Sequence, residues 1–540
     1  MLHLRTKKIW AEAQNNKTNN DARTLPCYTG GVHPNCDYTH GEIMPLPGVK
    51  NIQIVRANRT YPELADGTKT TYKHGPDIVH FAGRFYIQYL VSPRDEHEQG
   101  GFSVLASSDG NFSLCEFRVS FPPYRIPKCE ITDYKGLTHS FNGETYGFMH
   151  QRMSFYKSSE GRMLLLGFYG WSPEKWMTNW DNYGIGRAVR EIYPDGEMSP
   201  IYFIKPNYQA GWSKELLNYP LYSESEDKDF VRACDELLAN RLYTQQWAEE
   251  NGDGDDTITI KHPKGGTNQA FCWYSIDKDN IIGLWKHSKV ARSFNGGKTW
   301  TEVKTEPSLV MSGQKIWGQR LSDGRFALIY DPTLESTHRW PLCMVTSNDG
   351  IHFDNMRLIH GEVPMKRYGG FWKDFGPQYM RGITEGNEDE LCKDNNTYLV
   401  YSVNKEDIWV SKIPLLTGKD IFDMSDFETW NIYKPSYTEF KTFTSGGFKL
   451  SVRDKDPVDH FVCLHALNIG SKGSVSFNFS ADPTSEKPVY IELLDSKDHP
   501  AVRLSFTEND RLLYRATADI ELQKYEKGKE YEITLRPDCV

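Results

Sequence analysis

The sequence predicts an all-β fold in which a β-propeller is followed by a β-sandwich. Three observations support this prediction: β-rich hairpins recur along the chain, turn motifs close several of the strands that follow them, and the pattern changes after about residue 415. The composition agrees, because 14 Trp, 30 Tyr, 27 Phe, 43 Gly and 28 Pro among 540 residues suit short strands joined by tight turns.

Five segments share one pattern, in which a short β-rich run, a tight turn and a second β-rich run follow one another. They are residues 77–91, 152–169, 271–286, 315–330 and 396–413. Small antiparallel sheets repeated every ~40–50 residues are typical of a propeller. We therefore assign residues 1–415 to a propeller, and the uneven spacing of the hairpins indicates long insertions.

Turn motifs follow three of the expected third strands. Residues 293–300 read S-x-N-G-G-x-T-W, and residues 347–353 and 107–112 are shorter copies. They resemble the Asp boxes of sialidase-type propellers. The acidic or amide side chain accepts backbone N–H bonds within the turn, Gly supplies a positive φ, and the aromatic ring packs beneath. We expect these motifs to staple blades and to take no part in chemistry.

Two segments break the hairpin pattern. Residues 208–250 are rich in helix formers and predict an inserted pair of short helices. Residues 416–540 carry short alternating strands with turns at close spacing, which is typical of a β-sandwich. Residues 251–256 (NGDGDD) resemble a calcium loop in composition, but the Glu that would close an EF-hand is missing, so we interpret them as an acidic turn.

The charge balance and the cysteines limit the possible functions. With 63 Lys and Arg against 72 Asp and Glu, the formal net charge is −9 and no basic run appears, so nucleic-acid binding is not expected. No apolar run is long enough to span a membrane. The ten cysteines show no CxxC spacing that would indicate zinc. Either Cys27–Cys36 and Cys115–Cys129 are local disulfides, or the thiols are free.

A propeller forms its site at one end of the central channel, from residues at the starts of the inner strands and in nearby loops. His74 precedes the first hairpin and is placed to point into the channel, where it could act as a base or an acid. Tyr146, His150 and Arg152 could share one face of a strand, and together they could move protons and neutralise a carboxylate. A purely structural role stays open for each.

Further candidates would bind the substrate. They lie in loops or near the starts of expected strands and are mostly cationic, amide or aromatic: Arg94, His97, Arg187, Trp317, Gln319, Arg320, Lys373, Gln378, Tyr379 and Arg381. Several cationic residues at the channel mouth of an acidic protein favour a small anionic ligand, most simply a sugar carboxylate. No motif indicates a metal site.

Five longer segments resemble propeller polysaccharide lyases of gut Bacteroides-type bacteria: residues 74–101, 146–171, 184–204, 311–325 and 366–382. The most similar family is the L-rhamnose-α-1,4-D-glucuronate lyases, which act on arabinogalactan proteins. The resemblance implies a seven-bladed propeller with an accessory sandwich, exo action, and a periplasmic or secreted location. Related lyases place a His where His74 stands and a second His after the first hairpin, where Arg94 and His97 are the nearest equivalents.

The mechanism implied is β-elimination. An Arg bound to the uronate carboxylate would stabilise an enolate-like intermediate, and a neutral His or a tyrosinate would remove the C5 proton. No cofactor is required, although a bound Ca²⁺ could assist. Two alternatives stay open: a sialidase-like or α-L-rhamnosidase hydrolase on the same propeller, or a non-catalytic carbohydrate-binding propeller. The sandwich could bind carbohydrate or brace the propeller, and the oligomeric state is undetermined.

Overall fold

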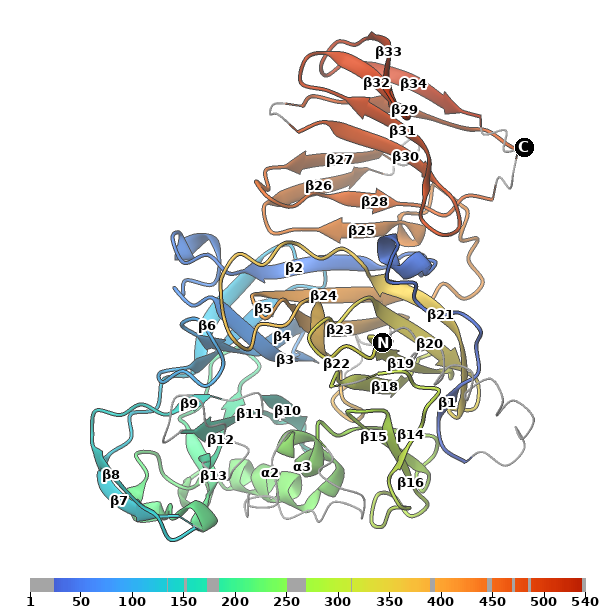
Figure 1. Cartoon of the computed structure of the whole chain (residues 1–540). Coiled ribbons are helices and arrows are strands. Elements are labelled where there is room, and N and C mark those ends of the chain that lie inside the picture. The colour runs from blue at the N-terminus through green and yellow to red at the C-terminus, as the bar shows by residue number, and fades with distance from the viewer. Residues whose placement is uncertain are drawn as a thin grey trace.

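The computed structural model describes residues 24–133, 135–149, 153–171, 184–249, 269–311, 313–388, 394–443, 449–468, 472–483 and 487–536. The fold is all-β, with an N-terminal β-propeller and a C-terminal β-sandwich, which lies above the propeller in Figure 1. Among the described residues, no helix is long and apolar enough to cross a membrane.

Five antiparallel sheets form the blades of the propeller in the described part of the chain. Strands are given from the first strand of each blade outward: the first blade consists of β3 (Tyr72–Phe81), β4 (Arg84–Ser92), β5 (Phe102–Ser108) and β6 (Cys115–Phe121), and the second of β10 (Ser154–Lys157), β11 (Met163–Gly170), β12 (Gly184–Ile192) and β13 (Tyr202–Pro206), with β9 (Phe148–Met149) beside β11. The third blade consists of β14 (Cys272–Ser275), β15 (Ile281–Trp285), β16 (Lys289–Ser293) and β17 (Lys304–Thr305), and the fourth of β18 (Ile316–Arg320), β19 (Phe326–Tyr330), β20 (Leu342–Ser347) and β21 (His352–His360). The fifth blade consists of β22 (Pro377–Gly382), β23 (Asn396–Val403), β24 (Asp407–Pro414) and β2 (Lys50–Arg56).

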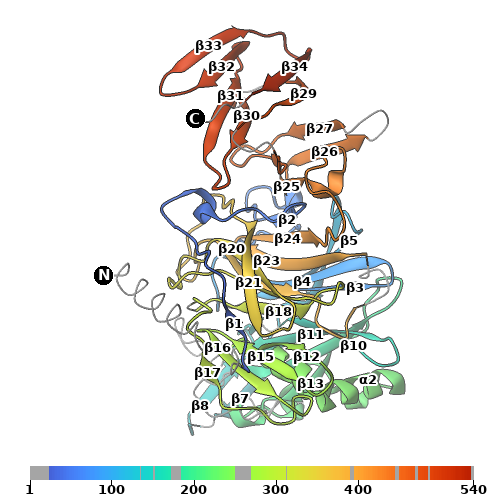
Figure 2. The ribbon, with the colours of Figure 1, turned by 90° about the vertical axis from the view of Figure 1, so that its right-hand side faces the viewer.

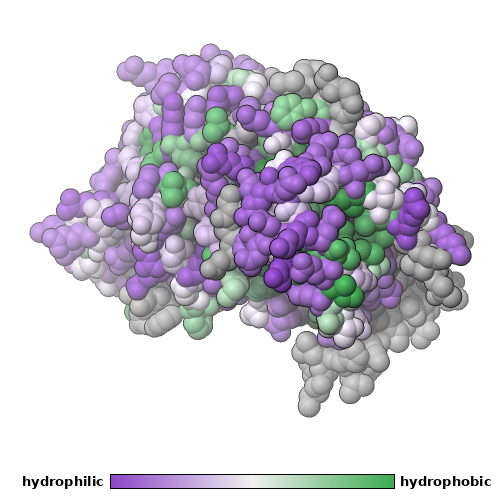
Figure 3. Space-filling view, turned by 90° about the horizontal axis from the view of Figure 1, so that it is seen from above, coloured by the Kyte–Doolittle hydropathy of each residue, from purple (hydrophilic) through white to green (hydrophobic). Residues whose placement is uncertain are grey.

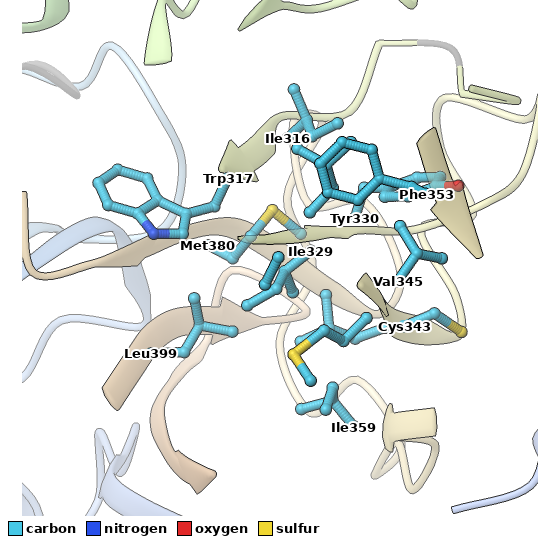
Figure 4. Packing of buried hydrophobic residues seen from close by; sticks show 14 of the residues in the cluster. Ile316, Trp317, Ile329, Tyr330, Cys343, Val345, Phe353, Ile359, Met380 and Leu399 are labelled. Carbon is cyan, nitrogen blue, oxygen red and sulfur yellow. The ribbon is translucent and has the colours of Figure 1, made fainter. Parts of the chain in front are cut away.

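The described residues therefore show five blades where the lyase resemblance implies seven. The five blades correspond to the five hairpins read from the sequence. Their first strands line the axis, since β3 contacts β10 and β22, and β18 contacts β14 and β22. The apolar side chains of adjacent blades pack between the sheets, and Figure 4 shows Trp317, Ile329, Met380 and Leu399 in the cluster between the fourth and fifth blades.

The fifth blade closes the ring with a strand from the other end of the chain. β2 pairs antiparallel with β24, and on its other side it pairs parallel with β25 (Asn431–Lys434), so that it lies between the two in Figure 2. β25 in turn pairs with β28 (Val462–Leu464). A short strand, β1 (Cys27–Tyr28), adds in parallel to β21. Because the sheet runs on from the fifth blade through β2 to β25, the division at residue 415 stays a prediction.

The predicted insertion is helical. It holds α2 (Lys228–Ala239) and α3 (Arg241–Ala248), which lie low in Figure 1. Asp227 caps α2 by accepting bonds from the backbone N–H groups of Asp229 and Phe230, both at 3.0 Å. The buried face of α2, which includes Phe230 and Leu237, packs against the second and third blades. The helices thus bridge the gap between β13 and β14.

The sandwich holds two short sheets and one longer one. They are β26 (Thr438–Phe443) with β27 (Lys449–Asp454), β29 (Val475–Ser480) with β34 (Glu530–Leu535), and β30 (Val489–Leu494), β31 (Pro500–Phe506), β32 (Arg511–Arg515) and β33 (Asp519–Lys524). Its own core centres on Leu504 and Phe506. Seen from above, this end of the molecule is mostly hydrophilic, with scattered apolar patches (Figure 3).

The Asp-box turns staple the blades as expected. In the first, Ser293 Oγ accepts the Gly297 N–H at 2.9 Å and Asn295 Oδ1 accepts the Thr299 N–H at 2.9 Å, while the Trp300 ring packs on Phe271. In the second, Asp349 Oδ1 accepts two backbone N–H bonds at 2.8 Å. In the third, Asp109 Oδ1 accepts one at 3.2 Å. All three turns lie at the ends of third strands.

None of the eight cysteines among the described residues is in a disulfide. The two local disulfides considered from the sequence, Cys27–Cys36 and Cys115–Cys129, are therefore not formed. Among the described residues no group of three His, Cys, Asp or Glu side chains could hold a metal ion. The acidic turn at 251–256 lies outside the described residues.

Candidate functional site

The polar side chains of interest gather on one face of the propeller, which we call the site face. Strand pairing defines it: Tyr72 at the start of β3 is paired with Ser92 at the end of β4, and Pro377 at the start of β22 is paired with Val403 at the end of β23. Alternate ends of the antiparallel strands therefore meet here. The Asp-box turns lie at the opposite ends of the strands.

Tyr379 is the centre of the site. Its phenolic oxygen accepts a hydrogen bond from Lys286 Nζ at 2.8 Å. Lys315 Nζ lies 4.1 Å and Arg339 Cζ 5.5 Å from the centroid of its ring. Its φ of 55° places a bulky residue in the left-handed region, which is costly and concentrates at functional sites. Three cations therefore lie around this phenol.

His74 lies against Tyr379, with ring centroids 4.2 Å apart in an edge-on arrangement. Its Nδ1 is 2.6 Å from Ser402 Oγ, while its buried Nε2 has no hydrogen-bond partner among the described residues. Burial, with the charges of Lys405 and other cations, holds the pKa of this imidazole well below its usual range. His74 is therefore neutral, and a neutral imidazole can accept a proton.

Glu249 enters the site from the end of α3. Its Oε1 pairs with both Lys315 and Arg381, and its buried Oε2 has no hydrogen-bond partner in the described part of the chain. Arg381 also lies 3.5 Å from Asp77, and burial raises the pKa of the Asp77 carboxyl despite that cation. The helical insertion thus delivers a carboxylate one side chain away from Tyr379.

A second group of ion pairs supports this centre. Lys405 lies 3.4 Å from Glu96 and 3.1 Å from Asp374. Arg339 lies 3.2 Å from Asp374 and donates to Gln378 Oε1 at 2.9 Å. Buried charges of this kind need both partners and fixed geometry, so the network holds Arg339 in place over the Tyr379 ring.

Several of the residues singled out in the sequence meet in this region. His74, Gln378, Tyr379 and Arg381 belong to the cluster, and buried Lys373 pairs with Glu406 beside it. His97 lies at its edge, packed against Trp372. Arg187 is fully buried and donates to the Trp247 carbonyl at 2.8 Å, two residues before Glu249. It contacts the insertion that supplies the carboxylate.

The side chains of the other expected residues that the structure describes do not join this cluster. Arg320 is at the far end of β18, exposed and over the Phe326 ring, because the strand runs away from the site face. Trp317 is buried in the core and donates to Gln319 at 2.7 Å. Arg94 is exposed and pairs with Glu98, and Tyr146 is 39% exposed and bridges to Arg125. His150 and Arg152 lie outside the described residues.

Sequence reasoning missed three side chains that surround Tyr379, namely Lys286, Lys315 and Arg339. The first two could have been predicted from the sequence, because Lys286 ends one predicted hairpin and Lys315 begins the next. Strand direction places both on the site face. Arg339 and Glu249 could not be found in this way, because a loop and a helix carry them.

Known proteins match this chain over the propeller and over the sandwich. A family model described as a BT_1020-like N-terminal beta propeller matches residues 25–264, and a model described as the CBM domain of sialidase-like proteins matches residues 430–539. The chain is similar to a solved sialidase. That structure is 36% identical and has a TM-score of 0.85 over 94% of this chain. No match was found among curated proteins.

The chain spans about half the length of that sialidase, 47%. A mutant of Trypanosoma rangeli sialidase with trans-sialidase activity is 9% identical over 91% of this chain and 87% of its own, with a TM-score of 0.39. A Hadza microbial sialidase is 11% identical over 68% and 69%, with a TM-score of 0.42. These two are too distant to carry an argument.

Proposed function

We propose that this protein is a glycoside hydrolase that removes an acidic sugar, with Tyr379 as its nucleophile. One observation carries the proposal: the phenolic oxygen of Tyr379 accepts a bond from Lys286, and Lys315 and Arg339 lie over its ring. The solved structure that is 36% identical carries the name sialidase. Tyrosine is the nucleophile that sialidases use where most glycosidases use a carboxylate.

The charge arrangement gives a physical reason for this choice. A sugar carboxylate would repel an anionic nucleophile beside it, whereas a phenol approaches it uncharged. The cations around Tyr379 would hold that carboxylate and stabilise the phenolate as it forms. Glu249, which shares Lys315 with Tyr379, keeps that ammonium oriented. His74 is neutral and packs edge-on against the phenol ring. It would accept the phenolic proton by turning its unpartnered Nε2 toward the hydroxyl, and would pass that proton to the departing sugar oxygen.

A second candidate is the β-elimination expected from the lyase resemblance. One observation favours it: a neutral His74, whose Nε2 has no partner among the described residues, stands beside a tyrosine and several cations. This is the set needed to remove a C5 proton from a uronate and stabilise the enolate. Both candidates use the same side chains, so the products must distinguish them.

The test uses two probes, a sialyl oligosaccharide and an oligosaccharide that ends in rhamnosyl-glucuronate. Hydrolysis releases a free acidic sugar or a free rhamnose without ultraviolet absorbance, whereas elimination creates a double bond conjugated to the carboxylate, which absorbs. We expect acidic-sugar release without absorbance, and a loss of at least ~100-fold in kcat for Tyr379→Phe. An absorbing product would contradict hydrolysis and establish the second candidate.

A further inference from the structure

Next to the site, the loop of residues 361–376 between β21 and β22 presents two adjacent aromatic side chains. We call it the rim loop. Phe371 is 70% exposed, and Trp372 is half-buried. Their rings meet edge to face with centroids 4.9 Å apart. The loop leads directly into β22 and Tyr379, so the pair lies on the site face.

The aromatic pair is held firmly although it faces solvent. The backbone N–H groups of Phe371 and Trp372 both donate to the Asp95 carboxylate, the second at 3.0 Å. The Trp372 ring packs edge-on against His97, with centroids 6.0 Å apart. A Cβ at Gly370 would lie 3.2 Å from the Arg94 carbonyl oxygen, which shows how closely the rim loop approaches the loop after β4.

The rim loop is also tied to the centre of the site. Lys373 donates to the Thr71 carbonyl at 2.7 Å and is buried. Asp374, two residues after Trp372, pairs with Arg339 and Lys405, and Arg339 lies over the Tyr379 ring. Asp374 and Arg339 therefore connect the rim loop to the proposed nucleophile.

We propose that Phe371 and Trp372 form a stacking subsite for the sugar ring to which the acidic sugar is joined. This rests on the proposed function. A single exposed Phe is ordinary on a protein surface, but two aromatics with their backbone N–H groups fixed by one carboxylate form a pre-organised platform. The C–H groups of a pyranose face carry partial positive charge and pack on the negative face of an aromatic ring. The subsite selects oligosaccharides over simple glycosides.

The experiment compares a long and a short substrate of the same acidic sugar. The pairs are sialyllactose with methyl sialoside, and an oligosaccharide that ends in glucuronate with methyl glucuronide. In Phe371→Ala, KM for the oligosaccharide should rise about threefold to tenfold, while kcat/KM for the methyl glycoside stays unchanged. Asp95→Ala should give the same selective loss with both rings present, because it frees the two backbone N–H groups.

Met365→Ala is the matched control, since Met365 is on the same loop and 86% exposed. This variant should change neither KM for the oligosaccharide nor kcat/KM for the methyl glycoside. Equal effects of Phe371→Ala on both substrates, or none on the oligosaccharide, would overturn the subsite. If no probe is turned over, the proposed hydrolase function is contradicted. The subsite is then tested separately, by measuring the binding of the two oligosaccharides with titration calorimetry. Weaker binding in Phe371→Ala than in Met365→Ala supports the subsite; equal binding, or no binding by the unmodified protein, overturns it.

Discussion

Tyr379 combines two features that a structural tyrosine does not need. Its backbone is in the left-handed region, with φ of 55°, and its hydroxyl accepts a bond from a lysine that is itself buried. Buried lysines are expensive unless an acceptor holds them. At the residue scale, the fold therefore collects cations around an oxygen that becomes negative during the proposed reaction.

Glu249→Gln tests the carboxylate in this charge arrangement. The change keeps the size of the side chain but leaves Lys315 and Arg381 without their shared anion. We expect kcat to fall by at least ~10-fold, and KM for an acidic substrate to fall or stay level, because the site becomes more positive. Glu236→Gln is the control, since Glu236 lies on α2 of the insertion and bonds to Tyr156 and Ser159 of the second blade. A rise in KM with kcat unchanged would contradict this role.

Prediction from sequence works for residues whose place depends on strand order alone. His74 and Tyr379 can be found because they lie near the starts of β3 and β22, whereas Arg381 is the fifth residue of β22, after an irregularity in the strand pairing. Arg320 lies apart from the cluster, at the far end of β18, because the hairpin pattern does not show how many residues separate a side chain from the site face. Glu249 and Arg339 escape prediction because an insertion and a loop bring them in through tertiary packing, which has no local signal.

At the scale of elements, the stability of α2 depends on the contacts of its first turn. Asp227 accepts two backbone N–H bonds there and pairs with Arg162, which also pairs with Glu191 on β12. The cap therefore fastens the insertion to the second blade as well as starting the helix.

Asp227→Ala should destabilise this element by about 1–2 kcal/mol, because the cap and one partner of Arg162 are lost together. Hydrogen exchange should quicken over residues 228–239 while the blades stay protected. Asp229→Ala, which removes only an exposed pairing with Arg232, is the control. Unchanged exchange in α2 would show that the cap does not limit its stability.

The contact between η2 (Thr39–Glu42) and the sandwich is sensitive to pH. His40 pairs with Asp498 and with Glu362, the latter at 2.9 Å. Although burial opposes it, these two carboxylates raise the pKa of His40 to about 10. A raised pKa means that the pairing stabilises the fold fully below the unfolded value of about 6.5 and is lost as the pH rises through about 10.

The stability difference between the unmodified protein and His40→Gln should thus be largest near pH 6 and shrink steadily toward pH 10. Thermal unfolding at a series of pH values measures it. His33→Gln serves as the control, because burial lowers the pKa of His33 to about 4, so it is uncharged throughout this range. A difference that grows with pH would be inconsistent with a charged His40.

At the scale of the whole molecule, the repeat predicts the propeller and the change of pattern predicts the sandwich. The expected number of blades comes from the resemblance, and five are found among the described residues. No pattern in the sequence indicates that β2 closes the ring and carries β25 on its other edge, because strands far apart in the chain pair without a shared motif. Because β2 pairs with β25, we expect the sandwich to brace the closure of the propeller.

The ion pair between Arg56 at the end of β2 and Asp456 in the sandwich region tests this bracing. Both side chains are buried. Arg56→Met should cost about 3–5 kcal/mol, because it leaves a buried carboxylate without its partner, whereas the double variant with Asp456→Leu should recover much of the loss. Calorimetric unfolding of both variants measures this. A negligible cost in the single variant would show that the closure does not depend on the sandwich.

The central claim is that Tyr379 forms the covalent bond to the sugar, and trapping that bond tests it most directly. The protein is incubated with the activated fluorinated glycosyl fluorides of sialic acid and of glucuronic acid, and the labelled peptide is identified by mass spectrometry. We predict an adduct on the peptide that contains Tyr379, which is absent in Tyr379→Phe. Label on a different residue, or an adduct that persists in Tyr379→Phe, would contradict the claim.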